Sequence, residues 1–240
     1  MNESLNNIRT VTQMSTGELA LFAENAQKAA KNLSSSTLAF SDAALIYFQQ
    51  GDKMTTAMEK AEITMKAAAI SFNSSAKDMS EYLTAIWNSY QVGEEEMEHY
   101  VDIMANLGAN TATSMEEIST ALRKVAATAN NVGVGMEQMS SIIATSASVT
   151  RQSAEIIGTS WNTILSRIGG LKLGETLEDG VDLNKYSTAL QAIGVNVLDA
   201  SGELRDMGKV VDEIGEKWSS MSKAQQSALA QTIGGVRQYT

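Results

Sequence analysis

The sequence repeats one helical unit four times between Met79 and Ala147, and this repeat limits the fold more than any other feature. The units begin at Met79, Met97, Met115 and Met136, so that successive starts lie 18, 18 and 21 residues apart. Within each unit the apolar residues recur every three or four positions, which is the period of one face of an α-helix. A heptad coiled coil would repeat at a shorter interval. A single helix cannot bury such a face alone, so we expect the units to pack on one another.

Short glycine-containing segments separate the units. Glycine suits the left-handed position that ends a helix, and it occurs at Gly93, Gly108 and Gly133. Ser114 and Glu117 have the spacing of a capping box, which marks the start of the third unit. Short connections favour antiparallel neighbours, so the sequence predicts stacked antiparallel helical hairpins. We predict five consecutive helices over residues 76–168. Their expected core residues include Leu83, Val101, Leu122 and Ile143.

Composition favours a mainly all-α fold and excludes several classes of protein. The chain has no proline, which is disfavoured inside helices, and 43% hydrophobic residues are enough for a sizeable core. A net charge of −10 without a stripe of Lys and Arg argues against direct nucleic-acid binding. The absence of cysteine suits a reducing cytosol and excludes disulfides. We identify no signal peptide, and the most apolar early run is too short to span a bilayer.

We divide the chain into three parts: N-terminal helices over 1–52, a helical repeat core over 53–170, and a C-terminal part over 171–240. The C-terminal part begins with an acidic loop and a short helix that ends at Gly194. We then expect a small β-hairpin near residues 195–205, because two extended runs flank a turn that contains Gly202. The last two helices follow, with caps predicted at Ser222 and Asp206. The end at Thr240 has no terminating signal, so we expect a fragment of a longer protein.

No catalytic, cofactor-binding or metal-binding residues emerge from the sequence. The single histidine, His99, lies one turn after Glu95, but no further ligands or nucleophile accompany it. The acidic loop over 175–182 does not alternate its carboxylates as a calcium-binding loop does. The glycines near 133–135 follow a helix instead of a strand, so they do not form a nucleotide-binding loop. We therefore predict that the protein is not an enzyme and needs no cofactor.

Four large aromatic residues lie on the helical stripes, and two interpretations stay open for them. Trp87, Tyr90, Trp161 and Trp218 are expected in the core, because each continues an apolar face. The alternative is a partner-binding groove formed by Trp161 and the stripe beside it.

Two segments carry a resemblance to a known family. Residues 105–118 and 132–139 place glycine and then Met-Glu-Glu, or a close variant, at the start of successive alanine-rich helices. Residues 192–207 resemble a family pattern of Leu-Gly-Ile-x-Val-Phe-Asp-x-x-Gly-x-Leu-Arg-Asp-Leu, and Gly-Gly-x-Arg-Gln also occurs at 234–238. In this order the motifs resemble the tail tape measure proteins of long-tailed bacteriophages, of the minor-tail type found in phages and prophages of Gram-positive bacteria.

The resemblance covers roughly residues 53–240 and departs from the family pattern in two respects. Residues 153–161 read Ser-Ala-Glu-Ile-Ile-Gly-Thr-Ser-Trp, where family members often have Gly-x-x-Ala-Gly-Thr-Ala-Leu-Arg. This difference is typical of a subgroup of Gram-positive prophage sequences. The chain also lacks the very long helical rod of a tape measure, so it resembles the globular region alone.

The resemblance implies a structural and assembly protein that sets the length of the tail tube and leaves the tail during DNA ejection. The implied partners are tail assembly chaperones and the tail tube or distal tail proteins, together with further copies of the same chain and a membrane at ejection. The implied location is the tail lumen of the virion, after synthesis in the host bacterial cytoplasm. The alternative is a helical interaction domain of a bacterial signalling or secretion protein.

Overall fold

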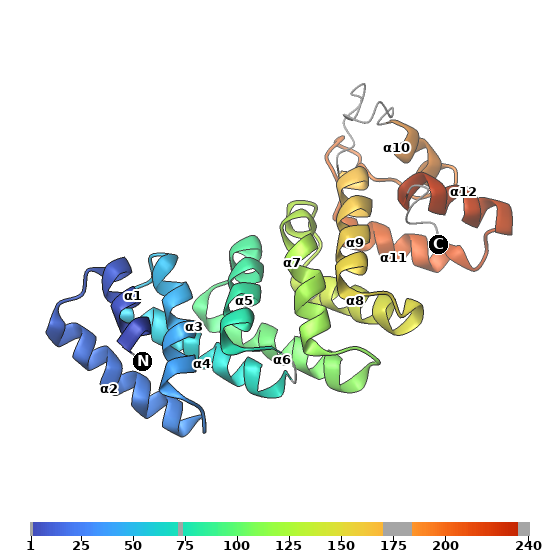
Figure 1. The fold of residues 1–240 in the computed structure, drawn as a ribbon. Helices are drawn as coiled ribbons and strands as arrows, with labels where there is room; N and C mark the ends of the chain where they lie inside the picture. Colours follow the sequence, from blue (N-terminus) through green and yellow to red (C-terminus); the bar gives the residue numbers. More distant parts are fainter. Residues whose placement is uncertain (1, 72–73, 170–183, 235–240) are drawn as a thin grey trace. The chain divides into compact units, whose positions relative to one another are not determined.

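The structure is a computed structural model that describes residues 2–71, 74–169 and 184–234, and these residues form a predominantly helical protein (Figure 1). Contacts among the Cα atoms group the chain into two compact units, Met1–Thr120 and Ala121–Thr240. The division lies within α7. The predicted division into three parts, at 52 and 170, stays a prediction.

The helices of the described residues follow the expected pattern closely. The first unit contains α1 (Asn2–Thr12), α2 (Thr16–Asn32), α3 (Thr37–Gln49), α4 (Met54–Ile70), α5 (Ala76–Tyr90) and α6 (Glu94–Asn110). The helix α7 (Met115–Asn131) crosses the division, and α8 (Met136–Thr150), α9 (Ala154–Gly169), α10 (Asn184–Gln191), α11 (Met207–Trp218) and α12 (Lys223–Gly234) follow. The five helices predicted over 76–168 are α5 to α9. Their four test residues Leu83, Val101, Leu122 and Ile143 are all at most 3% exposed, as predicted.

Capping boxes form at several helix starts, including those predicted before α7 and α12. The backbone N–H of Glu18 donates to the Ser15 hydroxyl while the Glu18 carboxylate accepts from Ser15, which closes a capping box on α2. Equivalent reciprocal bonds join Ser114 to Glu117 before α7 and Ser222 to Gln225 before α12. These bonds satisfy N–H groups that the first turn of a helix leaves without partners.

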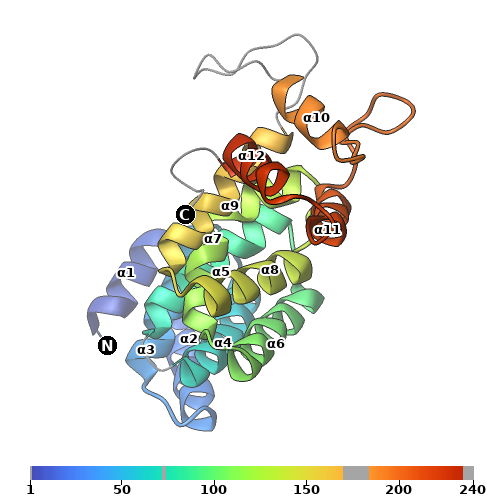
Figure 2. The same cartoon turned by 90° about the vertical axis from the view of Figure 1, so that its right-hand side faces the viewer.

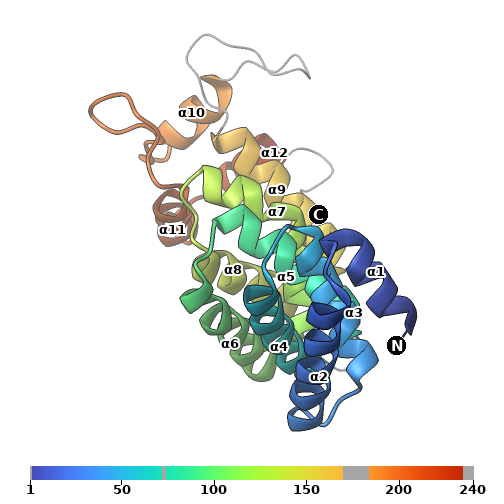
Figure 3. The same ribbon diagram turned by 90° about the vertical axis from the view of Figure 1, so that its left-hand side faces the viewer.

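The core of the first unit is built around α3, which packs against α1, α2, α4 and α5. Figure 3 shows α1 and α2 beside this helix. The Phe48 ring of α3 meets Phe22 of α2 edge to face, with 5.5 Å between ring centroids. The Tyr47 ring stacks on Trp87 of α5 at 6.1 Å, and its hydroxyl pairs with that of Thr64 on α4 at 2.5 Å. One helix therefore joins three neighbours through aromatic and polar contacts.

The second unit is organised by α9, which contacts α8, α10, α11 and α12. Figure 2 shows α9 beside α12. Toward α7, the glycine at 158 permits a close approach: a Cβ at this position would lie 2.5 Å from the carbonyl oxygen of Ala121. The Lys124 ammonium pairs with the Glu155 carboxylate at 3.0 Å on the same side. Residues Ile157, Leu165 and Ile168 of α9 are buried.

The β-hairpin predicted near 195–205 is wrong. The described segment has a single antiparallel bridge between Leu198 and Leu204 and no strand. The Asp199 carboxylate accepts hydrogen bonds from the N–H groups of Ser201 and Glu203, so the side chain organises this turn. Beyond the bridge, the Met207 N–H donates to the carbonyl of Val132 instead of extending a ladder. The turn closes as expected, but the chain leaves it too soon for a pair of strands.

Candidate functional site

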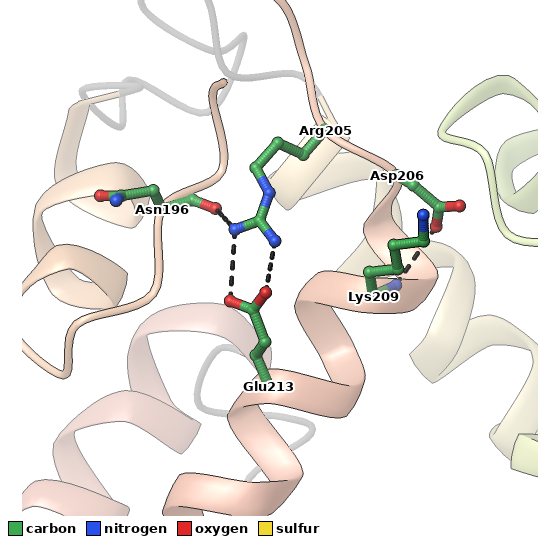
Figure 4. A network of polar contacts seen from close by, with 5 residues as sticks. All are labelled: Asn196, Arg205, Asp206, Lys209 and Glu213. Atoms are coloured by element: carbon green, nitrogen blue, oxygen red, sulfur yellow. Dashed lines mark hydrogen bonds and ion pairs between the residues drawn. The ribbon is translucent and has the colours of Figure 1, made fainter. Parts of the chain in front are cut away.

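The motif over 192–207 forms a turn directly before α11, and hydrogen bonds fasten this turn to the helix (Figure 4). The Arg205 guanidinium donates to the carbonyl oxygen of Asn196 at 2.6 Å and to both carboxylate oxygens of Glu213, in the second turn of the helix. The Asp206 carboxylate accepts the N–H of Lys209 at 3.2 Å and caps the helix. The two adjacent residues thus attach the turn to α11 and start that helix. The hydrogen bonds of both residues hold the local structure together.

The ion pair in this network shifts the protonation of its carboxylate. The hydrogen bond from Arg205 holds the pKa of Glu213 below its ordinary value of 4.5, and the charges of Arg205 and Lys217 act in the same direction. The side chains of Arg205 and Glu213 are 25% and 36% exposed, so water screens part of the attraction.

Behind the fastened helix lies an apolar groove formed by α9, α11 and α12, which we call the α9/α11/α12 groove. Its volume is about 270 Å³. Its lining consists of Trp161, Ile164 and Ile168 from α9, Val211, Ile214 and Trp218 from α11, and Leu229, Ala230, Ile233 and Gly234 from α12. The lining contains no charged side chain. A groove of this kind suits an apolar side chain or one face of an amphipathic helix.

Hydrogen bonds fix the α9 wall of this groove. The indole Nε1–H of Trp161 donates to the Ser146 hydroxyl of α8 at 3.0 Å, and that hydroxyl donates to the Ile142 carbonyl at 2.8 Å. Arg167 donates to the Ile233 carbonyl near the end of α12 at 3.3 Å. The polar edge of Trp161 is therefore satisfied inside the protein while its ring faces the groove, which is the arrangement expected of an anchored aromatic wall.

The structure separates the four aromatic residues that the sequence grouped together. Trp87 is only 2% exposed and belongs to the core, as predicted. Trp218 is 38% exposed and lines the groove, so its assignment to the core is wrong. Trp161 and Tyr90 are half-buried. The alternative interpretation, a groove around Trp161 and its stripe, describes the second unit better.

Sequence reasoning did not find the α12 wall of the groove or the contact of Arg167 with it. Leu229 and Ile233 are one helical turn apart, a spacing that indicates an apolar face but not the helix it meets. The paired atoms of Arg167 and Ile233 lie 66 residues apart in the sequence. No local pattern carries that information.

The residues considered for chemistry in the sequence are His99 and the acidic loop. His99 is exposed on α6, with its ring centroid 5.8 Å from that of Tyr100. The acidic loop over 175–182 lies outside the described residues. Within the described residues, no three His, Cys, Asp or Glu side chains gather in a way that could hold a metal ion. The absence of catalytic and metal roles for His99 and the acidic loop stays a prediction.

No helix that the structure describes is both long enough and apolar enough to cross a bilayer.

Fold and groove together define an α-helical protein with an open apolar groove in its second unit. The model of the phage-related minor tail protein family matches residues 24–235, and the chain belongs to this family. The chain is also similar to a "Probable tape measure protein" of Escherichia phage P2, with 21% identity over 224 residues. That similarity covers 92% of this chain and 26% of the phage P2 protein. This chain therefore spans about a quarter of the length of the phage P2 protein. No solved structure matches the chain.

Proposed function

We propose that this chain is the helical region of a phage tail tape measure protein, which sets the length of the tail tube and leaves the tail during DNA ejection. The observation that carries the proposal is the family match over residues 24–235, supported by the name of the phage P2 relative. The same match favours a tail protein over a domain of a signalling or secretion protein. A structural role fits a chain whose motif residues Arg205 and Asp206 fasten a helix.

The proposal includes a division of labour along the protein. Stacked antiparallel hairpins over 53–170 would form the packed repeat region, and a helical rod outside this chain would provide the length measure. An α-helix rises about 1.5 Å per residue, so an entirely helical chain of this size would reach only about 360 Å. The partners that we propose are tail assembly chaperones, tail tube or distal tail proteins, and further copies of the chain. A membrane is a further partner at ejection, and the location is the tail lumen.

In-frame deletions in the phage that encodes this chain test the proposal. Deleting part of the rod should shorten the tail by about 1.5 Å per residue removed. Deleting most of one repeat helix, such as residues 97–110 of α6, should abolish tails because it exposes the buried faces of its neighbours. Electron microscopy of tails from both deletion classes gives the answer. Unchanged tail length after rod deletion, or well-formed shorter tails after deletion of α6, would refute the proposal.

A further inference from the structure

The first unit has a groove of its own between α2 and α4, which we call the α2/α4 groove. Both helices pack on α3 and touch each other much less, so a channel of about 370 Å³ runs between them above Phe40 of α3. The α2 wall presents Leu21, Asn25 and Ala29, and the α4 wall presents Met54, Thr55, Met58, Glu59 and Glu62. Phe40 is fully buried and forms the floor.

The lining of this groove is partly apolar, and its two charged side chains, Glu59 and Glu62 at the exposed rim, are both acidic. Leu21 is 51% exposed, although the burial of a large aliphatic side chain is favourable. Met54 and Met58 are half-buried, and methionine adapts its shape to different partners. Glu59 and Glu62 are exposed on the same wall. Among the described residues, neither carboxylate forms an ion pair with a Lys or Arg.

The charge of the first unit strengthens this asymmetry. Residues 1–120 contain 7 Lys and Arg against 16 Asp and Glu, a net charge of −9 out of the −10 of the whole chain. A field of one sign attracts ligands of the opposite sign and speeds their association. The α9/α11/α12 groove has no charged lining, so nothing comparable selects its occupant.

We propose that the α2/α4 groove binds a basic amphipathic helix of a partner protein. The apolar face of that helix would rest on Leu21, Met54 and Met58, with Phe40 below. Lys or Arg side chains along one edge of the helix would pair with Glu59 and Glu62. These two carboxylates lie three residues apart on α4, close to one helical turn, so cations three or four positions apart on the partner match their spacing. This inference does not depend on the proposed role in tail length.

A designed peptide tests the proposal with the full 240-residue chain. The probe is a fluorescein-labelled 18-residue helix with a leucine stripe and one edge of lysines. One control peptide has glutamates in place of the lysines, and a second keeps the composition but scrambles the stripe. We expect the lysine peptide to bind at least tenfold more tightly than either control by fluorescence anisotropy. We also expect its affinity to fall as salt concentration rises.

Variants of the chain locate the binding site. The double substitution E59Q/E62Q keeps the size of both side chains and should weaken the lysine peptide about tenfold and flatten its salt dependence. The substitution L21S should weaken binding without changing the salt dependence. The matched control is E95Q/E96Q on α6, which removes two exposed charges of the same unit and should change affinity less than twofold. Circular dichroism establishes that each variant is folded.

Three outcomes would overturn the proposal. The first is equal binding of the lysine and glutamate peptides. The second is unchanged affinity of E59Q/E62Q, or loss of binding in W218A, which would place the peptide in the α9/α11/α12 groove. The third is self-association of the chain in analytical ultracentrifugation that E59Q/E62Q abolishes, because the groove would then hold a second copy.

Discussion

The two units differ in how they use nearly equal lengths of helical chain. Residues 1–120 gather α1, α2, α4 and α5 around α3, whose Phe40, Tyr47 and Phe48 are at most 3% exposed, and carry almost all the net charge. Residues 121–240 carry 11 Lys and Arg against 12 Asp and Glu, a net charge of −1. Their α9, α11 and α12 leave apolar side chains facing an open groove. The contrast teaches that amphipathic helices of similar length support two kinds of surface, and that burial and charge decide which.

The difference in grooves follows from which residues flank the buried stripe. On α4 the stripe of Ala57, Ala61 and Met65 is bordered by Glu59 and Glu62, so the edge of the groove is charged. On α9, Ile157, Leu165 and Ile168 are buried, and Trp161 and Ile164 beside them are apolar as well. The apolar face of α9 is therefore wider than the part of it that the neighbouring helices bury. A groove lined by apolar side chains alone is the result.

The largest expected loss of stability follows the truncation of a core side chain in the first unit. Phe22→Ala removes a fully buried ring that meets Phe48, and such truncations cost about 3–5 kcal/mol. The counterpart in the second unit is Trp218→Ala, which should cost far less because that side chain is 38% exposed. Urea unfolding followed by tryptophan fluorescence and hydrogen exchange measures both changes. A comparable loss of stability in W218A would mean that the groove is part of the core, and the contrast between the units would fail.

A pair of glycine substitutions should change the stability of the protein by an intermediate amount. It tests the close approach of two helices in the second unit. Gly158→Ala places a methyl group 2.5 Å from the Ala121 carbonyl oxygen and should destabilise α7 and α9 by about 1–3 kcal/mol, as overpacking does. The matched control is Gly215→Ala on α11, where nothing lies within 4 Å of the new methyl group. It should stabilise the protein by about 0.5–1 kcal/mol, because alanine is the better helix former. Thermal unfolding compares the two, and a stabilising G158A would disprove the close approach.

Sequence patterns predicted the helices well because helix signals are local. The capping box of Ser114 and Glu117 and the stripes through Leu83 and Val101 each lie within one helix, and the structure places them as expected. The hairpin prediction failed for a reason that is also local. Two short extended runs indicate strands, yet the Asp199 carboxylate holds the turn and Asp206 starts a helix directly after it.

The grooves were only partly predictable because they depend on contacts between distant helices. The stripe beside Trp161 indicated a candidate surface, but the partner walls come from α11 and α12, more than 40 residues further along. For the same reason Trp218 was assigned to the core. Its position on an apolar stripe indicates the face of the helix on which it lies, but not whether another helix covers that face. The acidic rim of the α2/α4 groove was not predicted. Nothing in the sequence around Glu59 and Glu62 indicates that α2 lies across a groove from them.

The smallest expected effect concerns the Arg205–Glu213 pair, which tests how firmly the motif turn is attached in the weakly charged second unit. The pKa of Glu213 lies below its ordinary value of 4.5 because Arg205 donates hydrogen bonds to the ionised carboxylate. The folded state therefore favours the ionised form, so the pair stabilises the protein above pH 4.5 and loses that contribution as pH falls through the lowered pKa. Both groups are solvated, so the contribution is small.

Glu213→Gln measures that contribution, with Glu216→Gln on the same helix as its control. At pH 7 the E213Q variant should melt slightly below the unsubstituted chain, and the difference should shrink as the pH is lowered below 4.5, where the native carboxylate becomes protonated. E216Q should melt close to the unsubstituted chain at pH 7, because Glu216 is exposed and forms no ion pair within the described residues. A melting difference for E213Q that stays constant with pH would show that the side chain acts through packing. The fastening of the turn would then rest on the Arg205 bond to Asn196 and on the Asp206 cap.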